Sequence, residues 1–332
     1  MRMDRRTLLR LAAGGAALPI APRLARAEDY PTRPIRLVLP FPPGGAFDIL
    51  GRPWADKASR TLGTVIVENL SGAGGSLAAA SVAHSPPDGY RIFLGSSAIH
   101  LTDMILRTHP LLNPMKDLMP ISMLATVCFA LAINPNVPVN TLGELIAHIK
   151  ANPGRLSYAS PGAGTMNHLC GEMLKSLTGI KDLPHVAYRG AGPAITDAIA
   201  GQVPFVIPSM TNAVLAFHRA GKLRLLAITN PTRLAIAPDI PTAEEAGVKG
   251  LVAQQLLGLF APTGTPELPV SRLAETNRAA LADKAYVQSL IEACVIPVAN
   301  PDEWTTERFN HFMDDEVARW EPLAKALGIR LD

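Results

Sequence analysis

The chain has 332 residues, of which 48% are hydrophobic and 18% are charged, and its formal net charge is +3. This composition excludes a disordered chain, because a chain with so many apolar residues can bury a sizeable core. The length suits two domains better than one. The 30 prolines and 26 glycines form neither a collagen period nor a proline tract, so we expect many short loops between regular elements.

The first predicted element is an export signal at residues 1–27. It has a charged start, an apolar run over residues 8–20 and a small-residue end, Ala-Arg-Ala, at 25–27. The Arg5-Arg6 pair fits the twin-arginine pattern, and the apolar run is shorter than the roughly 20 residues that span a bilayer. The alternative is an amphipathic N-terminal helix of a cytosolic protein.

This signal accounts for the positive charge of the chain. Residues 1–27 hold six arginines and one aspartate, a charge of +5, which leaves −2 for residues 28–332. The mature protein is therefore not basic, and with 5% aromatic residues and no basic stripe it has no signature of a nucleic-acid partner. No cysteine ends the signal, so we expect a soluble, exported protein of the periplasm without a lipid anchor.

From residue 31 onward, short apolar strands alternate with helices, a pattern typical of α/β folds with a mainly parallel sheet. The predicted strands of the first part lie at 35–40, 64–68 and 90–95, and the predicted helices at 47–62 and 76–84. A glycine-rich loop follows a strand and precedes a helix twice. The long, apolar and β-branched stretch at 121–134 then predicts a strand that runs from one domain into another.

The second part repeats the alternation. We predict helices at 141–151, 166–178, 192–201, 242–247, 270–293 and 301–327, and strands at 156–159, 185–188, 203–207, 223–229 and 256–261. The short helix at 242–247 has a Thr N-cap, two acids in its first turn and a final Gly. The strand at 223–229 is placed to cross back, so we predict two α/β domains: residues 31–128 with 227–332, and residues 129–226.

Motifs of catalysis and metal binding are scarce. The sequence has no Gly-x-Ser-x-Gly elbow, no HExxH and no paired CxxC, and Asn167 replaces the third glycine of a dinucleotide fingerprint that begins at Gly162. None of the eight histidines has a Cys or His partner at metal-ligand spacing. We predict no enzymatic activity, no cofactor and no metal. The alternative, an exported hydrolase of a small carboxylic ester or amide, would use Thr165 and His168.

The three cysteines, Cys128, Cys170 and Cys294, are an odd and widely spaced set. A chain of this size does not need a disulfide framework for stability. We expect buried free thiols, and the alternative is that two of them pair.

Two loops share one physical property. In Gly44-Gly45-Ala46-Phe47 and in residues 160–165, a strand ends and small residues lead into a helix. The first amides of a helix lack internal partners and its N-terminus carries a partial positive charge, so such an end can hold a carboxylate without Lys or Arg. Across a cleft, the two loops would clamp the ends of a diacid. The alternative is that the glycines only permit tight turns.

Eight stretches follow one another from residue 30 to about residue 266 in the order of one known family: YPTRPIRLVLPFPPGGAFD, VENLSGAGG, PPDGY, ELIAHIKANPGRLSYASPGAGTMNHL, HVAYRGAGPAITDAIAGQV, GKLRLLAITN, PDIPTAEEAG and GLFAPTGTP. With them the chain resembles the periplasmic solute-binding receptors of tripartite tricarboxylate transporters, the Bug/TctC-like family. The resemblance implies a type II periplasmic binding protein fold, two α/β domains with a ligand cleft that closes by hinge motion. It implies a receptor that passes a small di-, tri- or aromatic carboxylate to membrane subunits of such a transporter, or to a sensor protein. We expect a monomer.

By position, the resemblance assigns one carboxylate clamp to residues 41–48 and a second to residues 160–168. It implies that the ligand ends are held by the amides of Gly44, Gly45, Ala46, Gly162, Ala163, Gly164 and Thr165. The other ligand-binding residues that we predict are Phe41, Phe47, Asp48, Ser96, Ser97, Ser160, His168 and Tyr188. For Asp48 and His168, the alternative is a structural role at the start of a helix.

Two departures from the family pattern concern the expected pocket. Pro204 stands where members usually have Asp, with Pro208 close behind it, and Leu256 stands where Trp is typical. Both changes remove a polar or aromatic group near the expected pocket. We therefore predict a ligand less polar than citrate, an aromatic or aliphatic carboxylate that lacks an amino group.

Overall fold

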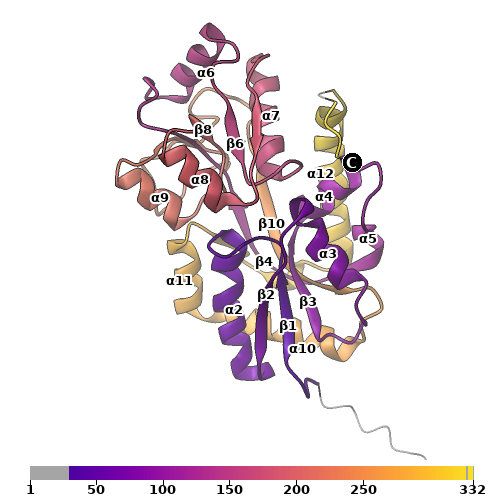
Figure 1. Ribbon diagram of the computed structural model, residues 1–332. Helices are drawn as coiled ribbons and strands as arrows, with labels where there is room; N and C mark the ends of the chain where they lie inside the picture. The colour runs from indigo at the N-terminus through magenta and orange to yellow at the C-terminus, as the bar shows by residue number, and fades with distance from the viewer. Residues whose placement is uncertain (1–29, 327, 332) are drawn as a thin grey trace, which may run out of the picture.

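The computed structural model describes residues 30–326 and 328–331, so the predicted export signal lies outside the described residues. In this part of the chain the strands form a six-stranded sheet, in the order β11-β4-β10-β3-β1-β2, and a five-stranded sheet, in the order β7-β6-β8-β5-β9. Figure 1 shows two lobes, one above the other. We call the part built on the six-stranded sheet the large lobe and the part built on the five-stranded sheet the small lobe.

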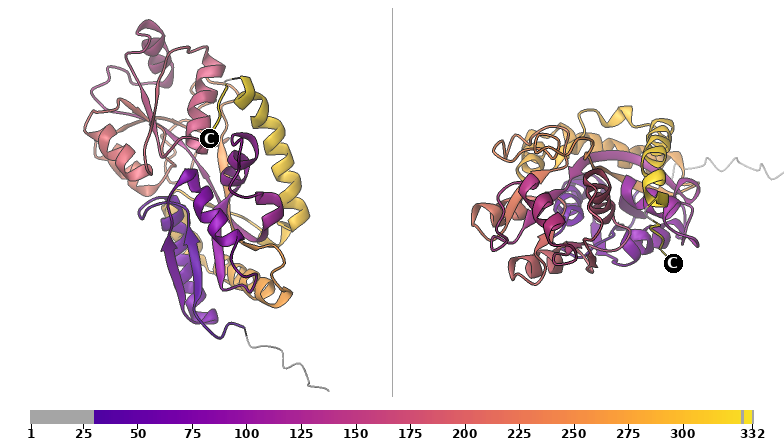
Figure 2. Two further views of the ribbon diagram at one scale, coloured as in Figure 1. Left: turned by 45° about the vertical axis from the view of Figure 1, so that its right-hand side comes forward. Right: turned by 90° about the horizontal axis from the view of Figure 1, so that it is seen from above.

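The large lobe takes its elements from both ends of the chain. Its strands are β1 (Ile35–Leu39), β2 (Val65–Asn69), β3 (Arg91–Ser96), β4 (Leu118–Cys128), β10 (Gln254–Pro262) and β11 (Ile296–Pro297). Its helices are α2 (Ala46–Leu62), α3 (Ser76–Ala83), α4 (Ser97–Ile105), α5 (Pro114–Asp117), α10 (Glu267–Ala282), α11 (Lys284–Glu292) and α12 (Thr306–Ala326). Helix α12 runs along one side of the molecule and ends beside the small lobe (Figure 2).

The small lobe is continuous in sequence. Its strands are β5 (Ala130–Ile133), β6 (Tyr158–Ser160), β7 (His185–Ala187), β8 (Phe205–Val206) and β9 (Arg224–Ile228). Its helices are α6 (Leu142–Ala151), α7 (Met166–Thr178), α8 (Ala191–Ile199) and α9 (Asn212–Arg219).

Both sheets are mixed, which corrects the predicted mainly parallel arrangement. Strand β1 pairs in parallel with β2 and β3, and β6 pairs in parallel with β7 and β8. Strands β4 and β10 pair antiparallel to each other, as do β5 and β9. The antiparallel pairs arise because the chain passes from the large sheet to the small one through β4 and β5 and returns through β9 and β10.

The two crossing segments connect the lobes. The predicted strand at 121–134 is the pair β4 and β5, separated only by the fully buried Phe129. The predicted strand at 223–229 is β9, which still belongs to the small sheet, and the return is completed by β10. Ile228 therefore pairs in the small sheet although it lies beyond the predicted domain boundary at 226. The division into domains remains a prediction.

Helix α2 illustrates how the sequence produces the packing that positions the cavity. Leu50, Trp54, Ala58 and Leu62 recur every four residues and are all buried, as their spacing predicts. Trp54 Nε1 donates to Asn277 Oδ1 of α10 at 3.2 Å. The helix is thereby fixed against the large lobe with its N-terminus at the edge of the sheet.

One predicted helix was wrong, and another is divided into two helices. Residues 242–247 form a single hydrogen-bonded turn: Glu245 N donates to Thr242 Oγ1 at 3.1 Å, and Thr242 N donates to Glu245 Oε2 at 2.8 Å. The capping signals therefore act, but the chain does not continue as a helix. Residues 270–293 are divided between α10 and α11 because the Asp283 side chain accepts from two amides of the first turn of α11.

The sequence patterns did not predict helices α4, α5 and α9 or strand β11. Cys128, Cys170 and Cys294 are free and buried, as expected. Within residues 30–326 and 328–331, no helix has both the length and the apolar character that a membrane crossing requires.

Candidate ligand-binding site

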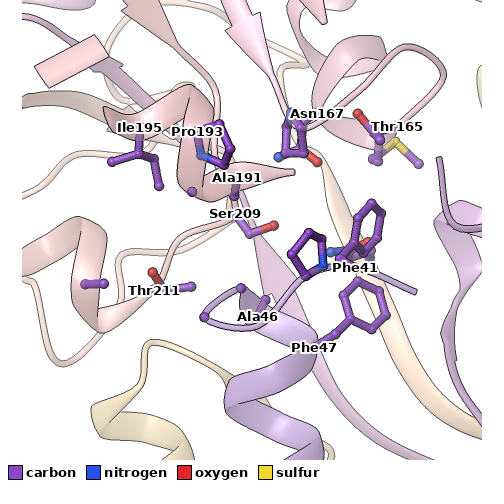
Figure 3. A pocket seen from close by; sticks show the side chains of 18 of the residues that line it. Phe41, Ala46, Phe47, Thr165, Asn167, Ala191, Pro193, Ile195, Ser209 and Thr211 are labelled. Carbon is purple, nitrogen blue, oxygen red and sulfur yellow. The ribbon is translucent and has the colours of Figure 1, made fainter. Parts of the chain in front are cut away.

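A cavity of about 240 Å³ lies between the two lobes. The large lobe contributes residues 41–47 and Gln255, and the small lobe contributes the start of α7 and residues of α8 and α9. In Figure 3, Phe41 and Phe47 lie on one side of the space, and Pro193 and Ile195 lie across from them. The described lining has no Asp, Glu, Lys, Arg or His side chain. A charged ligand would therefore have to be bound by neutral groups.

The starts of five helices border this cavity in the described structure. The lining residues from their first turns are Ala46 and Phe47 of α2, Ala98 and Ile99 of α4, Met166 and Asn167 of α7, Ala191 and Gly192 of α8, and Ala213 of α9. Each helix start carries a partial positive charge and amides without intrahelical partners. The cavity is thus suited to an anion although its lining is uncharged.

The helix starts differ in how their amides are satisfied. Ser96, Thr165 and Thr211 cap α4, α7 and α9, and the hydroxyl of each accepts from an amide of the first turn. The N-caps of α2 and α8 are Gly45 and Gly190, which make no side-chain cap bond. Helices α2 and α8 therefore begin without a side chain that accepts from their first amides.

Four amides are available at these two glycine-capped starts. In the described structure, the N–H groups of Ala46 and Phe47 in α2, and of Ala191 and Gly192 in α8, have no hydrogen-bond partner. The next position of α8 is Pro193, which has no N–H to offer. One pair of donors comes from each lobe.

The predicted first clamp is placed at the cavity only in part. Gly44, Gly45, Ala46 and Phe47 line it, together with Phe41, whose ring centroid is 5.3 Å from that of Phe47. The Gly44 amide, however, donates to Asp48 Oδ2 at 3.1 Å.

Asp48 itself does not line the cavity. Its Oδ1 accepts from Arg52 Nε at 2.8 Å, so the carboxylate holds the loop and the helix together. This geometry favours a structural role for Asp48 at the start of α2 over contact with a ligand.

The predicted second clamp is largely satisfied within its own loop. Gly162 N donates to Ser160 Oγ at 3.2 Å, Gly164 N to His168 Nδ1 at 3.2 Å, and Thr165 N to the Gly162 carbonyl at 3.3 Å. Of the residues predicted there by name, only Thr165 lines the cavity, and Pro161, Met166 and Asn167 of the same range line it too. Three of the four predicted amides of this loop are therefore occupied, those of Gly162, Gly164 and Thr165. The amides that α7 presents belong to the next residues, Met166 and Asn167.

Two histidines stack beneath this loop. The rings of His168 and His185 are 4.0 Å apart between centroids, and His185 Nε2 lies 2.6 Å from Ser160 Oγ. Burial lowers the pKa of both, and that of His185 to about 3. Both imidazoles are neutral near pH 7 and serve to support the loop.

The predicted pair Thr165 and His168 has no geometry for catalysis. Thr165 Oγ1 donates to the Gly162 carbonyl at 2.7 Å and accepts from the His168 backbone amide at 3.4 Å. The His168 ring accepts from Gly164 N instead of the threonine hydroxyl. A nucleophile needs its base within hydrogen-bond reach, and these two side chains are engaged elsewhere.

The other predicted residues lie behind the cavity wall. Ser96 caps α4, and Ser97 Oγ accepts from Leu256 N at 3.1 Å; both serines are buried. Tyr188 donates its hydroxyl to Asp197 Oδ2 at 2.8 Å. None of Ser96, Ser97 and Tyr188 lines the cavity.

The departures that suggested a less polar ligand do not form the wall of the cavity. Pro204, Pro208 and Leu256 are absent from its described lining. The Pro204 carbonyl accepts from Asn134 N at 2.9 Å at the far side of β5, and Leu256 is buried. The apolar wall comes instead from other residues, chiefly Phe41, Phe47, Ile195 and Phe217.

Sequence reasoning missed the contributions of α8, α9 and β10. Pro193, Ile195, Ser209, Thr211, Phe217 and Gln255 line the cavity. The start of α8 had a usable signal: Gly190-Ala191-Gly192-Pro193 places small residues directly before and inside a helix start, as does the loop before α2. The position of Gln255 depends on which face of β10 turns inward, and its sequence gave no sign of that.

Comparison with known proteins gives a consistent result. A profile described as tripartite tricarboxylate transporter family receptor, TctC, matches residues 50–329. Protein BugT of Bordetella pertussis is 35% identical over 324 residues, which cover 97% of this chain and 96% of that protein.

Solved structures share the fold. A protein of R. palustris with adipate has a TM-score of 0.85 at 32% identity, covering 91% of this chain and 99% of its own. The periplasmic binding protein BugD has a TM-score of 0.84 at 32% identity, with the same coverage. MatC from Rhodopseudomonas palustris with bound malate has a TM-score of 0.81 at 30% identity, covering 89% and 99%. The predicted periplasmic binding protein fold is confirmed.

Proposed function

The chain belongs to the tripartite tricarboxylate transporter receptor family, and we propose that it captures a carboxylate in the cavity between its lobes. The observation that carries this proposal is the pair of glycine-capped helix starts, α2 and α8, beside a lining without ionisable side chains. Backbone amides at a helix start bind an anion without a cationic side chain. The similar proteins solved with adipate and malate hold carboxylates as well.

The energetics indicate what else the ligand must have. Four charge-assisted hydrogen bonds of about 1.5 kcal/mol each supply roughly 6 kcal/mol. A micromolar Kd corresponds to about 8 kcal/mol, and association has further costs. Apolar contact with Phe41, Phe47, Ile195 and Phe217 therefore has to contribute, at roughly 25 cal/mol for each Å² buried.

The ligand class follows from this balance. We propose an aromatic or aliphatic carboxylate that is less polar than citrate. An amino group is disfavoured because the described lining has no carboxylate to pair with it.

The receptor would act without catalysis. The pair Thr165 and His168 supports no hydrolase, since each side chain is bonded to the loop that holds it. No group of three or more metal-ligating side chains occurs in the part of the chain described.

Delivery and location complete the proposal. We propose that residues 1–27 direct export by the twin-arginine route and that the mature receptor works in the periplasm as a monomer. The membrane subunits of a tripartite tricarboxylate transporter would receive the ligand, and a sensor protein is the alternative recipient.

A thermal-shift screen of residues 28–332 tests the proposal. The probes are benzoate, adipate, citrate and aspartate, each with sodium chloride as the control for anion effects. A ligand at 100 times its Kd adds about 2.7 kcal/mol to the free energy of unfolding, so benzoate or adipate should raise Tm more than citrate and aspartate do. If no carboxylate raises Tm beyond chloride, the proposed function is wrong.

A further inference from the structure

Gln255 is a buried polar side chain that the fold itself does not use. It belongs to β10, lines the cavity and is only 5% exposed. Among the described residues its carboxamide has no hydrogen-bond partner. Because the side chain lines the cavity, a bound ligand there can supply the partner that the protein does not.

The neighbouring residue shows the contrast. Gln254 precedes Gln255 on the same strand, so its side chain points to the opposite face of the sheet. Its Nε2 donates to Asn230 Oδ1 within the protein. Of these two neighbouring glutamines, only Gln254 has a hydrogen-bond partner within the described protein.

We propose that Gln255 determines specificity by hydrogen bonding to a hydroxyl group on the body of the carboxylate ligand. This inference rests on the proposed function and names a subclass of ligand, the hydroxylated carboxylates. A carboxamide offers both donors and an acceptor, and a hydroxyl can donate and accept as well. A hydroxyl therefore satisfies Gln255 in either orientation of its amide group.

A carboxylate fits this position less well than a hydroxyl. It accepts hydrogen bonds but donates none when ionised, so it would leave the Gln255 Oε1 atom facing an anion. The amides of α2 and α8 already provide donors for the carboxylate. Gln255 comes from β10, a strand that is separate from both helix starts.

Other neutral groups of the lining reinforce this choice. Ser209 and Thr211 border the cavity. Ser209 Oγ has no hydrogen-bond partner within the described structure, and Thr211 Oγ1 accepts from Val214 N, which leaves its own hydrogen free to donate. The lining thus combines apolar surface with uncharged hydrogen-bonding groups, as a hydroxylated ligand body requires.

The test measures Kd by isothermal titration for matched pairs of acids: benzoate with 3- and 4-hydroxybenzoate, and hexanoate with 6-hydroxyhexanoate. The wild-type receptor should bind at least one hydroxylated acid about tenfold more tightly than its parent, the effect of one buried hydrogen bond. Gln255→Met keeps the length of the side chain and removes its polar atoms. It should abolish that preference, so that each hydroxylated acid and its parent bind to the variant with equal Kd.

Gln254→Met is the matched control, since it alters the same strand on the face away from the cavity, and it should keep the preference. The inference is overturned if the wild type shows no preference within any pair, or if Gln255→Met retains it. In both cases the parent acids still bind, which distinguishes failure of this inference from failure of the proposed function. If no acid of any pair binds, the proposed function fails and this inference with it.

Discussion

Gly164 lies where the second loop of the small lobe meets the end of the chain. Its φ is +73°, and a Cβ added there would lie 2.0 Å from Leu331 Cδ1. Leu331 belongs to the other lobe, since its amide donates to the Leu106 carbonyl at 2.8 Å. A single glycine therefore permits both a left-handed backbone and close contact between the lobes.

We expect Gly164→Ala to lower the free energy of unfolding by about 1 kcal/mol for the backbone and by about 1 kcal/mol more for displacing Leu331. Gly179→Ala is the control, because its φ is +69° and nothing lies within 4 Å of an added Cβ. Urea unfolding measures the free energy of unfolding of both variants. In the Leu331→Ala background the excess cost of Gly164→Ala should vanish; an unchanged excess would refute the contact as its cause.

His100 makes stability depend on pH. It is 1% exposed and packs against Phe260 and Phe309, with ring centroids 4.6 and 5.5 Å away. Its Nε2 has no partner in the described chain, and burial lowers its pKa to about 4. Between about pH 6.5 and pH 4 the unfolded chain binds a proton that the folded chain does not, so stability falls as the pH falls.

Replacing this histidine should flatten the pH dependence. With its folded pKa near 4, His100 accounts for a loss of up to about 3 kcal/mol between pH 7 and pH 4. His100→Phe should remove that part, while His168 and His185 maintain a remaining slope of the same sign. Urea unfolding at pH 7, 5.5 and 4 measures the change. The exposed His109 provides the control His109→Gln; an equal effect of both variants would show that burial of His100 is not the cause.

Among the helices, α2 and α8 would bind the carboxylate through the amides at their starts. Ala191→Pro removes one of these donors and keeps the helix, because proline is favoured at the first helical position and the ψ of Gly190 before it, 168°, is far from the helical values that a following proline disfavours. We expect a carboxylate to bind about five- to tenfold more weakly, the loss of one hydrogen bond, with Tm nearly unchanged. Isothermal titration measures the Kd of the carboxylate for the variant and the wild type.

The control for that variant is Thr306→Pro, at the exposed first position of α12 and away from the cavity. It changes the same kind of helix position and should leave the Kd at its wild-type value. Equal weakening by both variants, or no weakening by Ala191→Pro, would count against the amide site.

The helix starts also show what a sequence can reveal. Glycine-rich loops after strands predicted that α2 and α7 begin at the ligand site, and residues from both starts line the cavity. The sequence could not show that Ser160 and His168 occupy the amides of the second loop, because those bonds depend on how the loop closes. The capping signals at 242–247 were similarly correct for one turn, yet no helix follows, since tertiary packing decides whether a turn is extended.

At the scale of the whole molecule, the lobes touch around the cavity. A Cβ at Gly190 would lie 3.2 Å from Pro42 Cδ, and one at Gly74 would lie 3.5 Å from the Ala163 carbonyl oxygen. Each pair joins one residue of the large lobe to one of the small lobe. Alternation of strands and helices was sufficient to predict two lobes, whereas these contacts depend on the angle between them, which the sequence pattern does not encode.

The charge of the molecule leads to a further prediction. Residues 28–332 carry a charge of −2, and the described cavity lining is uncharged, so the receptor would not attract its ligand through a positive field. Long-range attraction is what salt screens most strongly. We therefore expect the Kd of a bound carboxylate to change by less than about threefold between 0.05 and 0.5 M sodium chloride, in isothermal titrations at constant pH. A tenfold weakening would indicate a cationic site.

The central claim is that backbone amides at the lobe interface select a carboxylate, and isothermal titration of an acid and its neutral amide tests it most directly. Benzoate and benzamide share one apolar body, as do adipate and adipamide, and differ in the negative charge. We expect that one equivalent of the acid binds and that the matched amide binds at least about tenfold more weakly, since charge-assisted hydrogen bonds are the stronger ones. Equal affinity for acid and amide, or no binding of either acid, would contradict it.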